Sequence, residues 1–136
     1  MTLEPRPRVN SVTTGEKSVL IVEDDADSRY VYGLILEDNG FRVATARSGD
    51  EGLRLARELQ PQAILMDVSI PGMDGWTVTK RLKSDPQTAG IPVIIITAHA
   101  FPEDLGRAER AGCEGFLTKP CEPRRVLEEV RRLVRA

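Results

Sequence analysis

Apolar residues are distributed along this chain in two alternating patterns, and each pattern predicts a different kind of element. Five short apolar runs are candidate strands, at Val19–Val22, Phe41–Ala44, Ala63–Met66, Val93–Ile96 and Gly115–Leu117. Three of these runs are apolar without a break and rich in β-branched residues or leucine, which is typical of strands buried on both faces. We therefore expect a parallel sheet that is covered on both sides.

The stretches between and after these runs have helical spacing, at about residues 27–39, 48–60, 75–84, 102–112 and 123–134. In the first stretch Val31, Leu34 and Ile35 share one face, which we expect to pack against the sheet. In the second stretch Ser48 and Glu51 have the spacing of a capping box. Five strands alternating with five helices predict an α/β fold with a doubly wound parallel sheet, because crossover connections are right-handed.

Ligand sites in such sheets lie beyond the carboxyl ends of the strands, where the strand order changes. The residues after the apolar runs agree with this expectation, because polar side chains follow four of the five runs. They are Glu23, Asp24 and Asp25 after the first run, Asp67 after the third, Thr97 after the fourth, and Thr118, Lys119 and Pro120 after the fifth. The sequence therefore predicts one polar site at this edge of the sheet.

Carboxylates gathered in this way repel one another, by about 4 kcal/mol for two charges 4 Å apart at an effective dielectric of 20. Either one carboxylate keeps its proton or a cation neutralises the group. Oxygen ligands at a small open site favour Mg²⁺ or Mn²⁺, which accept phosphate oxygens. Since Lys119 adds a further positive charge, the chemistry that fits is phosphoryl transfer, with an aspartate as a possible acceptor.

With these motifs in place, the chain resembles the receiver domain of two-component response regulators from about residue 17 to residue 136. The matching stretches are VLIVEDD at 19–25, ILMDVSIPGMDG at 64–75, IIITA at 94–98 and GFLTKP at 115–120. Their order and spacing match together, which makes the resemblance specific. It implies a flavodoxin-like fold in which five parallel strands lie in the order 2-1-3-4-5 with five helices. Residues 1–16, which show neither period, are expected to be a flexible N-terminal tail.

The resemblance also implies roles for the acidic residues. Asp67 corresponds to the phosphoacceptor of the family. Asp24 corresponds to the direct ligand of the metal, Mg²⁺ or Mn²⁺, and Glu23 to a neighbour that acts through water. Ser69 occupies the position whose backbone carbonyl binds the metal. Glu23 replaces a more frequent aspartate, which lengthens that side chain.

The residues after the fourth and fifth runs correspond to the rest of the family's site. Lys119 matches the lysine that pairs with the phosphoryl group. Thr97 matches the hydroxyl that moves to meet it, and Phe116 the aromatic switch that changes rotamer with it. Phe116 replaces a tyrosine found in many members, which removes a hydroxyl and keeps the bulk. Pro120 matches a proline that usually follows a cis peptide bond.

The resemblance implies a switch in a phosphorelay and not a conventional enzyme, since such a domain catalyses only its own phosphorylation and dephosphorylation. Its expected phosphodonor is a histidine kinase or histidine phosphotransfer protein, and its output is contact with a downstream protein partner that the sequence does not name. The 19 basic and 21 acidic residues give a net charge of −2, which offers no electrostatic case for nucleic acid. No apolar run is long enough to span a membrane, and two cysteines without a ligand pattern suit a reducing cytoplasm.

Three other functions are weighed against this one. A pseudo-receiver would bind partners without taking phosphate, and the presence of Asp24, Asp67, Thr97 and Lys119 argues against it. A metal-dependent phosphatase with an aspartyl nucleophile usually has a second aspartate two residues later, where this chain has Ser69. A dinucleotide-binding fold requires a glycine-rich turn after the first strand, and an acidic turn stands there instead.

Overall fold

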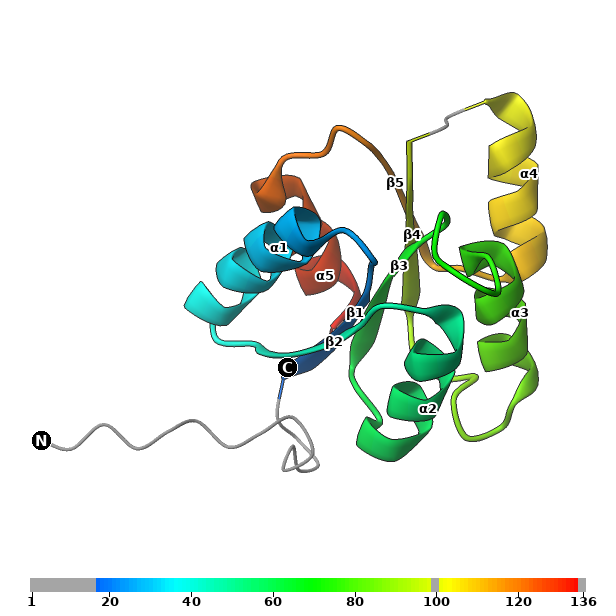
Figure 1. Ribbon diagram of the computed structural model, residues 1–136, viewed down its shortest axis with the longest axis horizontal. Coiled ribbons are helices and arrows are strands. Elements are labelled where there is room, and N and C mark those ends of the chain that lie inside the picture. The colour runs from blue at the N-terminus through cyan, green and yellow to red at the C-terminus, as the bar shows by residue number, and fades with distance from the viewer. Residues whose placement is uncertain (1–16, 99–100, 135–136) are drawn as a thin grey trace, which may run out of the picture.

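The computed structural model describes residues 17–98 and 101–134, and the tail predicted at residues 1–16 lies outside them. Five strands form one parallel sheet in the order β2-β1-β3-β4-β5 (Figure 1). Their bounds are β1 Ser18–Val22, β2 Arg42–Ala46, β3 Ala63–Asp67, β4 Val93–Thr97 and β5 Gly115–Thr118. The predicted strand order and direction are confirmed. The second strand lies slightly later than the apolar run suggested.

Five helices connect and follow the strands: α1 Ala26–Asp38, α2 Gly49–Leu59, α3 Gly75–Ser84, α4 Pro102–Ala111 and α5 Pro123–Leu133. Helices α1 and α5 cover one face of the sheet, while α2, α3 and α4 cover the other (Figure 1). Alternate residues of β1 show why both faces are apolar. Val19 and Ile21 pack under α1 and α5, and Leu20 and Val22 pack under the other three helices.

The predicted capping box of α2 is only half formed. The Ser48 hydroxyl accepts a hydrogen bond from the Glu51 backbone N–H at 3.3 Å. The Glu51 carboxylate, however, accepts from the N–H of Arg47 at 2.7 Å. Both bonds still satisfy backbone donors at the start of the helix. The helix therefore begins where the sequence predicts, but the Glu51 carboxylate accepts from the N–H of Arg47 instead of that of Ser48.

The packing face predicted for α1 is wrong at two of its three residues, since only Ile35 packs against the core, partly buried. Val31 and Leu34 are exposed, at 41% and 45%, whereas Tyr32, Gly33 and Leu36 are buried. The helix has apolar residues on two adjoining faces, so spacing alone does not choose between them. Packing decides the choice, because Tyr32 and Leu36 lie in the core between this helix and the sheet.

The parallel register brings the carboxyl ends of β1, β3, β4 and β5 to one edge of the sheet. Val22 pairs with Met66, Asp67 with Ile96, and Thr97 with Thr118. Residues just beyond these pairs are therefore neighbours, although up to 96 positions separate them in sequence. None of the helices in the described residues is both long enough and apolar enough to cross a membrane.

Candidate metal and phosphoacceptor site

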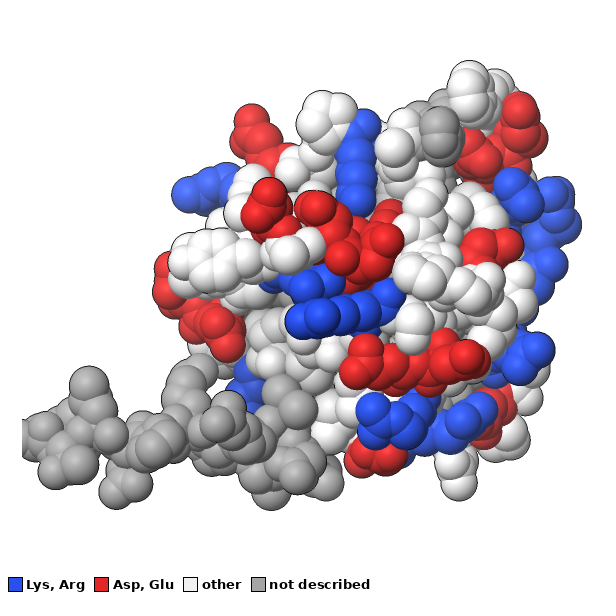
Figure 2. Space-filling model, in the orientation of Figure 1, with Lys and Arg blue, Asp and Glu red and all other residues white. Residues whose placement is uncertain are grey.

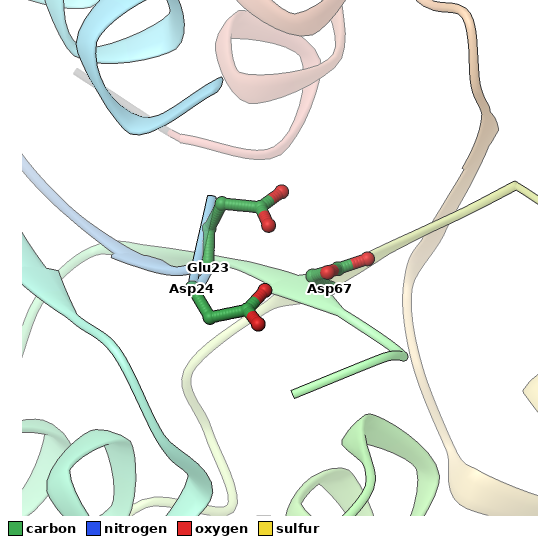
Figure 3. A group of neighbouring side chains, drawn as sticks. All are labelled: Glu23, Asp24 and Asp67. Atoms are coloured by element: carbon green, nitrogen blue, oxygen red, sulfur yellow. The ribbon is translucent and has the colours of Figure 1, made fainter. Parts of the chain in front are cut away.

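Three carboxylates meet at this edge of the sheet. Glu23 and Asp24 follow β1 directly, and Asp67 is the last residue of β3. One carboxylate oxygen of each residue lies within 4.8 Å of the others. Figure 3 shows the Glu23 and Asp24 carboxylates at the end of β1, with Asp67 beside them on β3. Glu23 and Asp67 are buried and Asp24 is exposed, so the cluster is open to solvent on one side.

Lys119 supplies the positive charge of the cluster. Its Nζ donates to Glu23 Oε1 at 2.9 Å and lies 3.5 Å from Asp67 Oδ1. Burial disfavours the charged ammonium, but the hydrogen bond to Glu23 and the charges of Asp67 and Glu23 outweigh it and raise the pKa of Lys119. The lysine therefore stays protonated, and its shortest contact in this state is to Glu23.

The Asp67 carboxyl is strongly perturbed by its surroundings. Burial and the nearby charge of Glu23 raise the pKa of Asp67 to about 7, although Lys119 and the Ser69 backbone N–H oppose the rise. The raised pKa means that the surroundings stabilise the ionised Asp67 carboxylate less well than water does, because the positive charge near it is too small. A bound cation would supply that charge and favour the ionised, nucleophilic form.

The loop after Asp67 is held against the site by its backbone. The Gly75 N–H donates to the Val68 carbonyl at 2.9 Å, which closes residues 68–75 into a compact turn. A Cβ on Gly75 would overlap the Asp67 carbonyl oxygen, so glycine is needed for this close approach. Asp74 then caps α3 by accepting from the Thr77 N–H at 2.8 Å. The loop thus has little freedom to move away from the acceptor.

The other residues expected at the site lie on β4, on β5 and on the loop after β3. Thr97 is buried at the end of β4, the strand next to β3. Ser69 is exposed two residues after Asp67, and its backbone N–H bonds to the Asp67 carboxylate. Phe116 on β5 stacks on Trp76 of α3. The bond between Lys119 and Pro120 is cis, as the resemblance implies.

The donor set fits a small, hard cation. Three carboxylates on one open pocket offer oxygen ligands and an excess of negative charge, which suits Mg²⁺ or Mn²⁺ and leaves room for water or phosphate. In Figure 2 acidic side chains gather near the middle of the face that carries the strand ends, with basic side chains beside them. Asp25 is not part of the donor set, because its carboxylate accepts from the N–H and the hydroxyl of Ser28 and caps α1.

A parallel sheet with this strand order and an acidic pocket at the carboxyl edge defines a class of signalling domain. Residues 19–131 match the family model of the response regulator receiver domain, and the chain belongs to this family. It is a receiver domain of response regulators in two-component signalling, and its acidic pocket fits the magnesium and phosphoacceptor site of such domains.

Particular relatives are similar along most of the chain. The polar-differentiation response regulator DivK of Brucella ovis is 41% identical over 115 residues, which are 85% of this chain and 94% of that protein. The chemotaxis protein CheY4 of Vibrio cholerae has a TM-score of 0.83 and 29% identity, covering 88% of this chain and all of that one. The receiver domain of the sensor histidine kinase PA1611 from Pseudomonas aeruginosa, solved with magnesium in its active-site cleft, has a TM-score of 0.80 and 28% identity, covering 88% and 98%.

Two residues near the site were not predicted to have a role there. Arg29 of α1 donates to backbone carbonyls of the acidic loop. Trp76 of α3 contacts both Phe116 and Arg107. The sequence signal that could have indicated a role for Arg29 is its position as a basic residue in the first turn of the helix that follows an acidic loop. For Trp76 no sequence signal indicates which ring it meets.

Proposed function

We propose that this receiver accepts a phosphoryl group on Asp67 in a reaction that depends on Mg²⁺ or Mn²⁺. The observation that carries the proposal is the convergence of Glu23, Asp24 and Asp67 with Lys119 at one open pocket. The phosphodonor would be a histidine kinase or histidine phosphotransfer protein, as for receiver domains in general. A cytoplasmic location is part of the proposal, because the donor's phosphohistidine must reach the pocket.

The chemistry follows from the placement of the side chains. An Asp67 carboxylate oxygen attacks the phosphorus, the bond from phosphorus to the donor's imidazole nitrogen breaks, and the imidazole leaves with the electron pair and takes up a proton. The product is an acyl phosphate on Asp67. The metal would be held by Asp24, Asp67 and the Ser69 carbonyl, with Glu23 acting through water. When bound, it would neutralise the charge that develops on the phosphoryl oxygens.

The residues of the chain would complete the site after transfer. Lys119 lies 3.5 Å from Asp67 and would exchange its contact with Glu23 for one with the phosphoryl group. The Thr97 hydroxyl, at the end of the neighbouring strand, would move to the phosphoryl group, and Phe116 would change rotamer with it. The altered surface around α4 and α5 would then bind a downstream protein.

Phosphorylation with a small-molecule donor tests the proposal directly. The purified protein is incubated with acetyl phosphate, with and without MgCl₂, and its intact mass is measured. We expect the mass of one phosphoryl group to be added only with the metal and to be absent from Asp67→Asn. Asp85→Asn is the matched control, because Asp85 lies far from the site on the loop after α3, and this variant should be labelled like the parent.

This experiment separates the alternatives when it is combined with a Mg²⁺ titration and an assay of phosphate-ester hydrolysis. A parent protein that binds Mg²⁺ but gains no phosphoryl group would be a pseudo-receiver. Sustained hydrolysis of a phosphate ester would indicate a phosphatase. The geometry is against a phosphatase, because Ser69 stands where such enzymes place their second aspartate.

A further inference from the structure

Arg29 connects helix α1 to the acidic loop that precedes it. Its Nη1 donates to the backbone carbonyl of Glu23 and to that of Asp24, each at 2.9 Å. The side chain is half-buried against the loop. Glu23 and Asp24 are also the two residues after β1 whose carboxylates belong to the acidic cluster. A single guanidinium nitrogen therefore holds both peptide groups from which those side chains extend.

The other restraints on the loop lie at its two ends and on the Glu23 side chain, which accepts from the Asp25 N–H at 3.1 Å and from Lys119 at 2.9 Å. The ladder of β1 ends at Val22, and the N–H of Glu23 donates to Ala46 at 2.9 Å. Asp25 then begins the helix by accepting from Ser28. Between these two fixed points the chain turns through Glu23 and Asp24. The Arg29 guanidinium donates to both carbonyls and so restrains this turn, because hydrogen bonds from a charged donor are stronger than neutral ones.

Arg29 would act on a metal ion in two opposing ways. Its positive charge near the pocket repels an incoming cation and weakens binding. Its hydrogen bonds hold Glu23 and Asp24 in the arrangement that a cation needs, which strengthens binding, since groups behind the ligands usually orient them. Because the guanidinium is partly exposed, water and salt screen its charge. The fixed geometry of the two carbonyls is not screened in this way.

We propose that Arg29 is a positioning residue of the metal site, and that it increases affinity for Mg²⁺ by fixing the loop that carries Glu23 and Asp24. The inference rests on the proposed function only in requiring that the acidic pocket binds Mg²⁺. It does not require that phosphate is transferred. The sign of the effect is what distinguishes it from a purely electrostatic role, in which removal of the charge would tighten binding.

The test is calorimetric titration of the protein with MgCl₂ in the absence of a phosphodonor. We expect Arg29→Ala to weaken Mg²⁺ binding by about tenfold. Arg29→Lys keeps the charge and a donor nitrogen with three N–H groups, and we expect it to recover most of the affinity. The matched control is Arg47→Ala, which removes an exposed cation directly after β2, the strand beside β1. This control should bind Mg²⁺ as the parent does, or slightly more tightly.

A kinetic measurement adds a second readout. With acetyl phosphate as donor, Arg29→Ala should need about ten times more Mg²⁺ for half-maximal phosphorylation and reach a rate close to that of the parent at saturation. Unchanged or tighter Mg²⁺ binding by a folded Arg29→Ala would overturn the inference and leave the proposed function intact. If Arg29→Ala does not fold, Arg29→Met, which keeps most of the length of the side chain and removes its charge and donors, takes its place in the titration. Weaker Mg²⁺ binding by Arg29→Met than by Arg47→Ala supports the inference, and equal or tighter binding overturns it. Failure of the parent to bind Mg²⁺ would overturn both proposals.

Discussion

The ring of Trp76 stacks on the ring of Phe116, with centroids 6.5 Å apart and planes 17° from parallel. The guanidinium carbon of Arg107, on α4, lies 5.5 Å from the centroid of the Trp76 ring. Trp76 directly follows Gly75, which packs on the Asp67 backbone. The indole therefore connects the loop of the candidate acceptor with Phe116 on β5 and with α4, one of the two helices expected to change in the switch.

Trp76 should report occupancy of the site, since it is the only tryptophan of the chain. If Phe116 changes rotamer when the site is filled, the stack is lost and the surroundings of the indole change. We expect its fluorescence to shift in intensity or wavelength when beryllofluoride and MgCl₂ are added together. Phe116→Leu should abolish most of this response. A parent spectrum that is unchanged at saturating beryllofluoride would refute the coupling between Phe116 and the site.

The perturbed Asp67 carboxyl predicts a stability difference that depends on pH. Burial and Glu23 raise the pKa of Asp67 from 3.8 to about 7, so the folded state binds the proton more tightly than the unfolded state. Stability without metal should therefore fall as pH rises from about 4 to 7. We expect Asp67→Asn to stabilise the metal-free protein by about 2 kcal/mol at pH 8 and by much less at pH 4. Urea unfolding in EDTA at both pH values measures this, and an equal effect at both would contradict it.

Binding of Mg²⁺ should be linked to the protonation of Asp67, so the effect of removing the metal should depend on pH. A cation requires ionised Asp67, so Mg²⁺ must displace a proton below pH 7. We expect the affinity for Mg²⁺ to weaken by up to tenfold per unit of pH between pH 7 and 5. Adding EDTA should lower the melting temperature of a Mg²⁺-loaded sample more at pH 8 than at pH 6. Titrations in Asp67→Asn, which carries no proton to displace, should lose this pH dependence.

Gly75 should be intolerant of a side chain. A Cβ there would overlap the Asp67 carbonyl oxygen and lie 2.8 Å from Val68 Cα, and both neighbours are backbone. We expect Gly75→Ala to destabilise the fold by about 2 kcal/mol or more and to slow phosphorylation, because the acceptor strand must shift. Gly90→Ala is the control, since a Cβ at Gly90 meets nothing within 4 Å. Chemical denaturation that gives equal midpoints for the two variants would show that the close approach is relaxed.

Glu129 predicts a loss of stability in acid that is separate from the site. This buried residue of α5 accepts from Arg132 Nη2 at 2.7 Å, and that hydrogen bond, with the charges of Arg132 and Arg125, holds its pKa below the usual 4.5 in spite of burial. A lowered folded pKa contributes stability that is complete above about pH 4.5 and is lost as pH falls through the folded value. We expect Glu129→Gln to cost about 1–2 kcal/mol at pH 7 and progressively less below pH 4.

The control for this prediction is Glu128→Gln, since Glu128 is exposed on the same helix. It should change the free energy of unfolding at pH 7 by about 0.5 kcal/mol or less. If thermal unfolding shows that the two substitutions lower the free energy of unfolding equally at pH 7, the ion pairs of Glu129 add no stability beyond that of an exposed glutamate.

Several features of the site could be predicted because they depend on short stretches of sequence. The apolar run at β3 ends at Asp67, and parallel strands place such ends at one edge, so the convergence with Glu23 and Lys119 followed from the pattern. The packing face of α1 did not follow. Residues 30–36 are apolar on two faces, and the packing of Tyr32 and Leu36 against the sheet decides between them. The half-formed capping box at Ser48 also depends on where the preceding turn places the Arg47 N–H.

The sequence by itself determined the elements, their order and the polar residues at the strand ends, because hydrophobic periodicity and turn residues act locally. Only the tertiary structure decided which side chain takes which partner. It gave Lys119 its shortest contact with Glu23, stacked Phe116 on Trp76, and brought Arg29 to two carbonyls of the acidic loop. Such contacts depend on distances between residues far apart in the chain or on the exact path of a loop, and spacing along the sequence carries neither.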